Sequence, residues 1–187
     1  MNRTSRTIGK EHWLRPLMTI RGASRGEFEM LADIERRAAT RFPEELGLDG
    51  DATCEASLLE ASLEESLLLV AVASGRPAGF AVAVPVERSV HLEEMSVLPE
   101  AGRNGLGRAL LASVVDASRE REYRNLTLTT FASVPWNAPF YARHGFRAKP
   151  SAALPRHVAE RLEAERAAGL PDRVGMEMRL MRDWLAG

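Results

Sequence analysis

Residues 102–108 read Gly-Arg-Asn-Gly-Leu-Gly-Arg and lie between a predicted strand and a predicted helix. Glycines let the backbone turn tightly and let a ligand approach it closely. The first N–H groups of a helix have no internal partner, and the helix dipole favours an anion beside them. Arg103 and Arg108 would add positive charge. The segment therefore predicts a cradle for a phosphate or pyrophosphate group.

Other chemistry-bearing patterns are weak or missing. No Gly-Lys-Ser/Thr follows the glycines, and the third glycine of a dinucleotide fingerprint would fall on Leu110, so both nucleotide-binding motifs are disfavoured. Cys54 is the single cysteine, and with no histidine near it in sequence a small buried hydrophobic role is favoured over a nucleophile. The four histidines show no zinc spacing, so we expect no metal.

Hydrophobic periodicity and turn residues predict the elements that must position the glycine-rich segment. Ser24 and Glu27 form a capping-box pattern at the start of a helix that runs to about Arg41. Further helices are predicted over 52–65, 106–120, 137–144 and 154–168. Strands are predicted over 18–21, 67–72, 79–84, 90–97, 126–131, 146–148 and 174–180. This order indicates an α+β fold with mixed strand pairing, in a single domain over 18–187. Residues 1–17 are interpreted as a polar N-terminal extension outside the core.

Composition sets the broad class. The 187 residues are 45% hydrophobic and 27% charged, which excludes a disordered chain or a coiled coil. Lys and Arg number 25 against 26 Asp and Glu, so no basic excess points to nucleic acid or acidic lipid. No apolar run approaches the ~18 residues of a membrane helix. A single cysteine fits a reducing compartment, and we expect a cytoplasmic protein.

Two segments together resemble a known family. Residues 92–97 (Leu-Glu-Glu-Met-Ser-Val), Pro99 and residues 103–111 resemble the acetyl-CoA-binding core of the GNAT N-acetyltransferase superfamily, and residues 140–146 (Phe-Tyr-Ala-Arg-His-Gly-Phe) resemble its second signature. The resemblance covers about residues 18–182. Two positions depart from the family pattern. Gly102 stands where Arg or Gln is usual, with Arg103 next to it, and Val134 stands where an Asn is often found, with Asn137 three residues later.

The resemblance implies a GNAT-like fold: a mixed, mostly antiparallel sheet flanked by helices, with a splay between the two central parallel strands. It implies acetyl-CoA as the cosubstrate, whose pantetheine arm pairs with the backbone freed by the splay, and whose acetyl oxygen receives the Met95 N–H. The pyrophosphate would sit on the backbone that opens the following helix. The implied cofactor-binding residues are Met95, Ser96, Val97, Arg103, Asn104, Gly105, Leu106, Gly107, Arg108 and Asn137.

The resemblance also implies that an amine attacks the thioester directly, without an enzyme nucleophile. Tyr141 would protonate the leaving thiolate, which suits a phenol whose ordinary pKa is near 10. Candidate bases lie on the strand over 90–97: Glu93 leads, and His91 and Glu94 are the alternatives. Strand alternation puts His91 and Glu93 on one face and Glu94 on the other, unless a bulge breaks the parity.

The function predicted is therefore acetyl transfer from acetyl-CoA to an amine. A small-molecule acceptor is favoured over a protein amine, and the acidic segment around residues 44–55 mildly favours a cationic one. The alternative is a sensor or regulatory domain that binds acyl-CoA without turnover; a nucleotide-binding module of another fold is disfavoured. A homodimer is compatible with the last strand or the 151–170 region as the interface. The acceptor's identity does not follow from the sequence.

Overall fold

The computed structural model describes residues 18–42, 46 and 53–180. The predicted extension over residues 1–17 lies outside the described residues, as does most of the acidic segment over 44–55. Among the described residues, the structure contains no helix with the length and apolar character that a membrane span requires.

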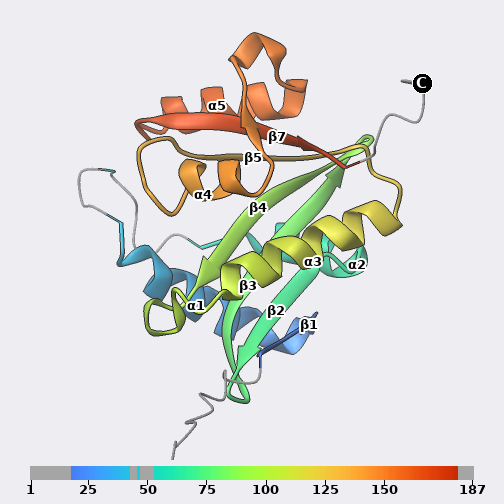
Figure 1. Cartoon of the computed structure of the whole chain (residues 1–187), viewed down its shortest axis with the longest axis vertical. Coiled ribbons are helices and arrows are strands. Elements are labelled where there is room, and N and C mark those ends of the chain that lie inside the picture. The colour runs from blue at the N-terminus through green and yellow to red at the C-terminus, as the bar shows by residue number, and fades with distance from the viewer. Residues whose placement is uncertain (1–17, 43–45, 47–52, 181–187) are drawn as a thin grey trace, which may run out of the picture.

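A mixed sheet of seven strands forms the centre of the molecule (Figure 1). Its order is β1-β2-β3-β4-β5-β7-β6, and every neighbouring pair is antiparallel except β4 and β5. The strands are β1 (Met18–Gly22), β2 (Leu68–Ala73), β3 (Arg76–Val86), β4 (Ser89–Val97), β5 (Asn125–Phe131), β6 (Arg147–Ala148) and β7 (Arg173–Arg179). The expected α+β class and the central parallel pair are confirmed, and β2 and β3 form an antiparallel hairpin.

The parallel pair separates early. Only Ser89, Val90 and His91 of β4 pair with β5, opposite Asn125, Leu126 and Thr127. Beyond these residues β4 runs six residues further and β5 four further without pairing to each other, and Figure 1 shows the two strands diverging. This divergence, called the splay below, leaves backbone groups of β4 without a partner strand on that side, as the family resemblance implied.

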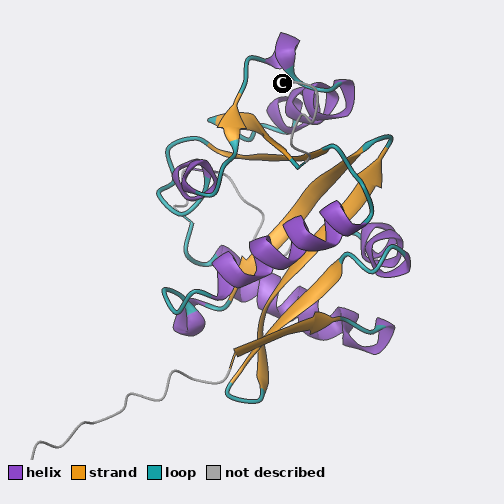
Figure 2. Cartoon of the chain, turned by 45° about the vertical axis from the view of Figure 1, so that its right-hand side comes forward, coloured by secondary structure: helices purple, strands orange, loops and turns teal. Residues whose placement is uncertain are grey.

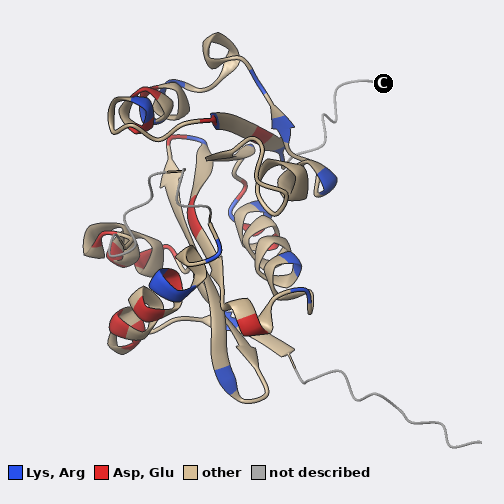
Figure 3. Cartoon of the chain, turned by 90° about the vertical axis from the view of Figure 1, so that its left-hand side faces the viewer, with Lys and Arg blue, Asp and Glu red and all other residues tan. Residues whose placement is uncertain are grey.

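Helices cover both faces of the sheet (Figures 2 and 3). One face carries α3 (Leu106–Glu120) and the short α4 (Ala138–Arg143); the other carries α1 (Phe28–Ala39), α2 (Ala56–Glu64) and α5 (Arg156–Ala167), and is called the α1–α5 face below. The largest fully buried side chains come from the sheet and from the helices on both of its faces. Examples are Phe80 of β3, Leu126 of β5, Leu31 of α1 and Leu110 of α3. The splay therefore lies between two helical layers.

Local chemistry explains the element boundaries. The predicted capping box is present, with the Ser24 N–H donating to Glu27 Oε2 at 2.9 Å, although the first turn is a 3-10 turn and α1 proper begins at Phe28. Gly145 ends α4 with φ of +97°, as a left-handed stop should. The helix expected over 154–168 begins at Arg156, because Pro155 precedes it and lacks the backbone donor of a helix interior.

The insertion between β6 and β7 is docked through a glycine. A Cβ built on Gly175 of β7 would lie 2.4 Å from Leu154 Cδ1 and 3.1 Å from Val158 Cγ1. Only a residue without a side chain lets the apolar stripe of α5 approach the strand this closely. The helix is thereby held over β5 and β7 on the α1–α5 face.

Candidate active site

A bulge in β4 changes which way its carboxylates face. Two neighbouring residues of β3, Val82 and Ala83, pair with Glu94 and Leu92 of β4. Glu93 lies between these two pairs without a partner of its own, so it is the extra residue of the bulge. Glu93 forms an ion pair with Arg161 of α5, and Glu94 accepts a hydrogen bond from Ser96 Oγ at 2.8 Å. The bulge thus puts two consecutive carboxylates on the α1–α5 face, where strict alternation would have separated them.

Glu93 and His91 both lie beside polar side chains of α5. His91 is 3% exposed, and its Nδ1 lies 2.9 Å from Thr127 Oγ1, which in turn lies 3.1 Å from His157 Nε2. Burial, reinforced by the positive charge of Arg161, lowers the pKa of His91 to about 3. A histidine that stays neutral at working pH and binds a proton so weakly is a poor base for an amine. The Glu93 carboxylate, for its part, is already neutralised by Arg161.

Glu94 lies in a different setting, beside a second acidic residue from α1. Burial raises the pKa of Glu94, while hydrogen bonds from the Ser96 hydroxyl and the Met95 amide oppose the rise. Burial raises the pKa of Glu35 to about 7, and the negative charge of Glu94 adds to the rise. Glu35 is anchored by the Cys54 N–H, which donates to Oε2 at 2.9 Å. The two carboxylates therefore form one electrostatic unit.

Tyr141 of α4 belongs to the same unit. Its side chain is 8% exposed and packs edge-on against Phe140 and Phe146, with ring centroids 5.2 and 5.5 Å away. Burial raises the pKa of the phenol, and the charge of Glu94 raises it further. The hydroxyl thus keeps its proton at any working pH, as a proton donor must.

The start of α3 has the features expected of an anion cradle. Its N-cap is Gly105, in the left-handed region with φ of +85°, and no side chain caps the helix. The first N–H groups of α3 have no intrahelical acceptor by geometry. A Cβ built on Gly107 would lie 3.9 Å from Val97 Cγ2, 3.9 Å from Phe140 Cζ and 4.0 Å from Met95 Cε. The helix start, the end of β4 and α4 therefore meet at Gly107.

The remaining predicted cofactor residues flank this junction. Arg103 and Asn104 are exposed in the loop before α3, and Arg108 is exposed on its first turn. Asn137 is the N-cap residue of α4 and is half-buried, and its carbonyl accepts the Tyr141 N–H at 3.0 Å. Val134, in the position where the family often has Asn, is buried. The assignment of these residues to the cofactor stays a prediction.

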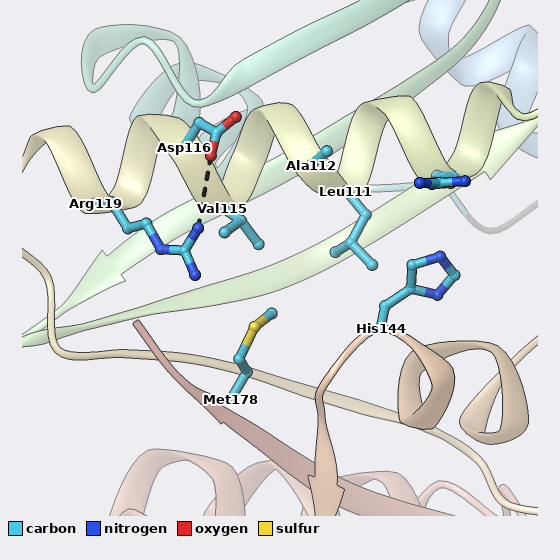
Figure 4. A pocket seen from close by; sticks show the side chains of 8 residues that line it. Leu111, Ala112, Val115, Asp116, Arg119, His144 and Met178 are labelled. Atoms are coloured by element: carbon cyan, nitrogen blue, oxygen red, sulfur yellow. Dashed lines mark ion pairs between the residues drawn. The ribbon is translucent and has the colours of Figure 1, made fainter. Parts of the chain in front are cut away.

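A pocket of about 240 Å³ opens beside the cradle, between α3 and the end of β7 (Figure 4). At one end Arg119 forms an ion pair with Asp116 at 3.7 Å. The lining residues are Arg108, Leu111, Ala112, Val115, Asp116, Arg119, His144 and Met178. Because Arg108 belongs to the glycine-rich segment and His144 ends α4, the pocket adjoins the junction described above.

The profile of the Acetyltransferase (GNAT) family matches residues 28–146. The chain belongs to this family. The matched range contains the glycine-rich segment, the bulged β4 and Tyr141, so the predicted family is confirmed and, with it, the GNAT fold. Family membership supports acetyl transfer by an N-acetyltransferase whose substrate is unspecified.

Solved structures share the fold at low sequence identity. An N-acetylglutamate synthase from Neisseria gonorrhoeae, complexed with coenzyme A and N-acetyl-glutamate, aligns with a TM-score of 0.67 at 22% identity, over 89% of this chain and 36% of that one. The ribosomal-protein-S18-alanine N-acetyltransferase from Escherichia coli aligns with a TM-score of 0.66 at 22% identity, over 91% and 99%. Naa50 from Arabidopsis thaliana, in complex with the bisubstrate analogue CoA-Ac-MVNAL, gives 0.61 at 13% identity, over 86% and 97%. The chain thus spans about a third of the synthase and nearly all of the two others.

Sequence reasoning missed Glu35 and Arg161. Glu35 was identifiable in principle, because it lies one turn after the buried Leu31 and next to Ile34, inside the apolar stripe of α1. Charged residues are seldom buried, so a charged residue on such a stripe indicates a role beyond packing. Arg161 gave no comparable signal, because α5 is rich in charged residues and nothing local separates those that face the sheet from those that face solvent.

Proposed function

We propose that the protein is an acetyl-CoA-dependent N-acetyltransferase that transfers the acetyl group directly to the amine of a small molecule. The observation that carries the proposal is the junction at Gly107. There the uncapped start of α3, the unpaired edge of β4 and the helix that bears Tyr141 come together at the splay.

In this proposal the cosubstrate enters from the side of α3 and α4. Its pyrophosphate would accept hydrogen bonds from the N–H groups that open α3, and Arg103 and Arg108 would add charge. The pantetheine arm would follow the free edge of β4 at Met95, Ser96 and Val97. Gly105, Leu106 and Gly107 supply the backbone approach, Asn104 and Asn137 flank it, and the pocket at Arg108 and His144 offers room for the nucleotide end.

The chain is assigned two proton transfers: one from the acceptor ammonium before the attack, and one to the leaving sulfur after it. We assign the base to Glu94, because Glu93 is paired with Arg161 whereas Glu94 is linked through charge to Tyr141. A carboxylate with a raised pKa accepts the proton of an approaching ammonium more readily than an ordinary one. The neutral nitrogen then forms a bond to the thioester carbon, and the carbon–sulfur bond breaks. Tyr141 gives its proton to the departing sulfur and recovers one from the new amide nitrogen.

An acceptor screen with acetyl-CoA tests this proposal. The full chain is incubated with acetyl-CoA and separate panels of aliphatic amines, amino acids and short peptides, and free thiol is measured. We expect thiol release with at least one amine, matched by one acetylated product, and loss of that release in the Tyr141→Phe variant. Tight acetyl-CoA binding with no thiol release for any acceptor would instead indicate a sensor.

A further inference from the structure

Arg41 follows the end of α1 and lies beside the glycine-rich segment. A Cβ built on Gly102 would lie 3.7 Å from Arg41 Nη1. An ion pair between Arg37 of α1 and Glu100 joins the same two stretches of chain, and Figure 1 shows the end of α1 next to the loop that joins β4 to α3. The Arg41 guanidinium therefore reaches the segment from α1, whereas the two arginines expected to contact the phosphates belong to the segment itself.

Gly102 carries no side chain at the place that Arg41 approaches. Its backbone has φ of −62° and ψ of 161°, a region that any residue adopts, so its conformation does not require glycine. A Cβ there would lie 3.1 Å from the Pro99 carbonyl oxygen as well as near the guanidinium. The position is also the one at which the family pattern usually has Arg or Gln. A guanidinium from another element thus lies close to where that side chain would start.

Aromatic rings hold the Arg41 guanidinium in place. Its Cζ lies 4.9 Å from the ring centroid of Trp136, in the loop between β5 and α4. Trp136 packs edge-on against Phe42 with ring centroids 6.0 Å apart, and Phe42 lies 5.7 Å from Phe131 of β5, which is buried. The guanidinium is therefore connected to the core by three rings. A side chain held in this way loses less conformational entropy when it binds a ligand.

Arg41 differs from the neighbouring arginines of α1 in its partners. Arg36 and Arg37 form ion pairs with Asp33 at 3.8 and 3.6 Å, and Arg37 also pairs with Glu100. Arg41 is half-buried and forms no ion pair with any residue in the part of the chain that the structure describes. A guanidinium carries five N–H donors, and phosphate oxygens match their geometry. The side chain is thus held in position with its donors available to an anion.

We propose that Arg41 binds a phosphate group of acetyl-CoA, as a third guanidinium of the cradle at the start of α3. The inference rests on the proposed function and adds to it a binding residue from α1's end, an element that the sequence does not connect with the cosubstrate. Trp136 is a positioning residue in this arrangement, because it holds the guanidinium. The phosphate is one of the pyrophosphate pair or the 3′-phosphate, and both offer the same anionic oxygens.

Calorimetric titration of acetyl-CoA into the full chain tests the inference without depending on turnover. The variants are Arg41→Gln, which removes the charge, and Arg41→Lys, which keeps it. The matched control is Arg36→Gln, which removes the same charge from the same helix at a residue already paired with Asp33. Each form is titrated at about 50 mM and about 300 mM sodium chloride, because salt screens a contact between charges and does not screen a loss of packing.

We expect Arg41→Gln to bind acetyl-CoA about tenfold more weakly than the wild type at low salt, and only about threefold more weakly at high salt. Arg41→Lys should show a smaller loss, and Arg36→Gln should follow the wild type at both concentrations. An Arg41→Gln affinity equal to that of Arg36→Gln overturns the inference. A loss of the same size at both salt concentrations also overturns it, because it would indicate a packing role.

Acetyl-3′-dephospho-CoA identifies which phosphate is bound. A loss in Arg41→Gln that persists with this ligand assigns Arg41 to the pyrophosphate, and a loss that disappears assigns it to the 3′-phosphate. Absence of acetyl-CoA binding in the wild type would refute the acetyltransferase proposal itself. Binding in the wild type that Arg41→Gln leaves unchanged would keep that proposal and remove Arg41 from the cradle.

Discussion

Two adjacent glutamates on β4, Glu93 and Glu94, differ in their suitability as the base because their contacts differ. The family resemblance favoured Glu93 as the base, with His91 and Glu94 as alternatives, and the identity of the base stays a prediction. The Glu93 carboxylate is paired with Arg161, so its negative charge is already balanced within the protein. Glu94 has only neutral described hydrogen-bond donors and a pKa raised by burial. The bulge at Glu93 puts both carboxylates on the α1–α5 face, so both are candidates for the base.

Glutamine substitutions at the two positions should separate their roles. In Glu94→Gln no carboxylate removes the acceptor's proton, so only the amine that is already deprotonated in solution can react. We expect its rate to rise about tenfold per pH unit below the pKa of an aliphatic amine, while the wild type rises less steeply. Glu93→Gln should keep the wild-type slope. Rates measured from pH 6 to 9 decide between them, and a steep slope confined to Glu93→Gln would move the base back to Glu93.

Tyr141 should matter for turnover more than for binding. Replacing it by Phe removes only the hydroxyl, and the aromatic packing against Phe140 and Phe146 is retained. We expect turnover to fall roughly 10²-fold, within the range typical of a positioned acid, with acetyl-CoA affinity nearly unchanged. Steady-state rates together with calorimetry measure both quantities. A turnover equal to that of the wild type would assign protonation of the thiolate to another group.

At the scale of elements, the start of α3 offers a test that does not depend on the acceptor. The protein itself leaves ordinary contact distances around a Cβ at Gly107, so Gly107→Val should fold. The branched side chain would nevertheless obstruct a pyrophosphate on the helix start, and we expect acetyl-CoA affinity to drop at least tenfold, about 1.4 kcal/mol. Ala164→Val, on the exposed face of α5, controls for the cost of a β-branched residue in a helix. Unchanged affinity in folded Gly107→Val would remove the pyrophosphate from this helix.

Elements were predictable where local chemistry decides them. The capping box was predicted from Ser24 and Glu27 alone and is present. The bulge at Glu93 was not readable, because it depends on how β3 and β4 align rather than on either strand alone. The contact of Arg161 with Glu93 likewise joins residues 68 positions apart in the chain, and no local pattern encodes it.

At the scale of the whole molecule, the splay explains why residues distant in sequence meet. Because β4 and β5 pair over only three residues, the two helical layers approach the same gap from opposite sides. The motif resemblance predicted this architecture and the α3 side of the site. It named the candidate bases on β4 but not their partners on α1 and α5, because those contacts arise only when α1, β4 and α5 pack on one face. The α3 side and the β4 carboxylates were thus recognisable in advance, and the residues that contact those carboxylates were not.

The stability of the whole molecule should depend on pH, and two of the groups with shifted pKa values, Glu35 and His91, act in opposite directions. Glu35 has a folded pKa of about 7, raised from 4.5, so the folded state binds more protons than the unfolded state between these values. Stability linked to Glu35 is therefore present below about pH 4.5 and is lost as pH rises toward 7. His91 has a folded pKa of about 3, lowered from 6.5, so its contribution is present above about 6.5 and is lost as pH falls toward 3.

Urea unfolding of the full chain at a series of pH values from 4 to 8 checks both directions. Each pKa unit corresponds to at most about 1.4 kcal/mol, and the solvent-screened Glu35 should contribute less per unit than the deeply buried His91. We expect Glu35→Gln to be stabilised relative to wild type near pH 8, with the difference shrinking toward pH 4.5. The control Glu29→Gln, the same change at an exposed position of the same helix, should follow the wild type throughout. The opposite trend, with Glu35→Gln losing stability as pH rises, would mean that Glu35 has a cationic partner in the folded protein.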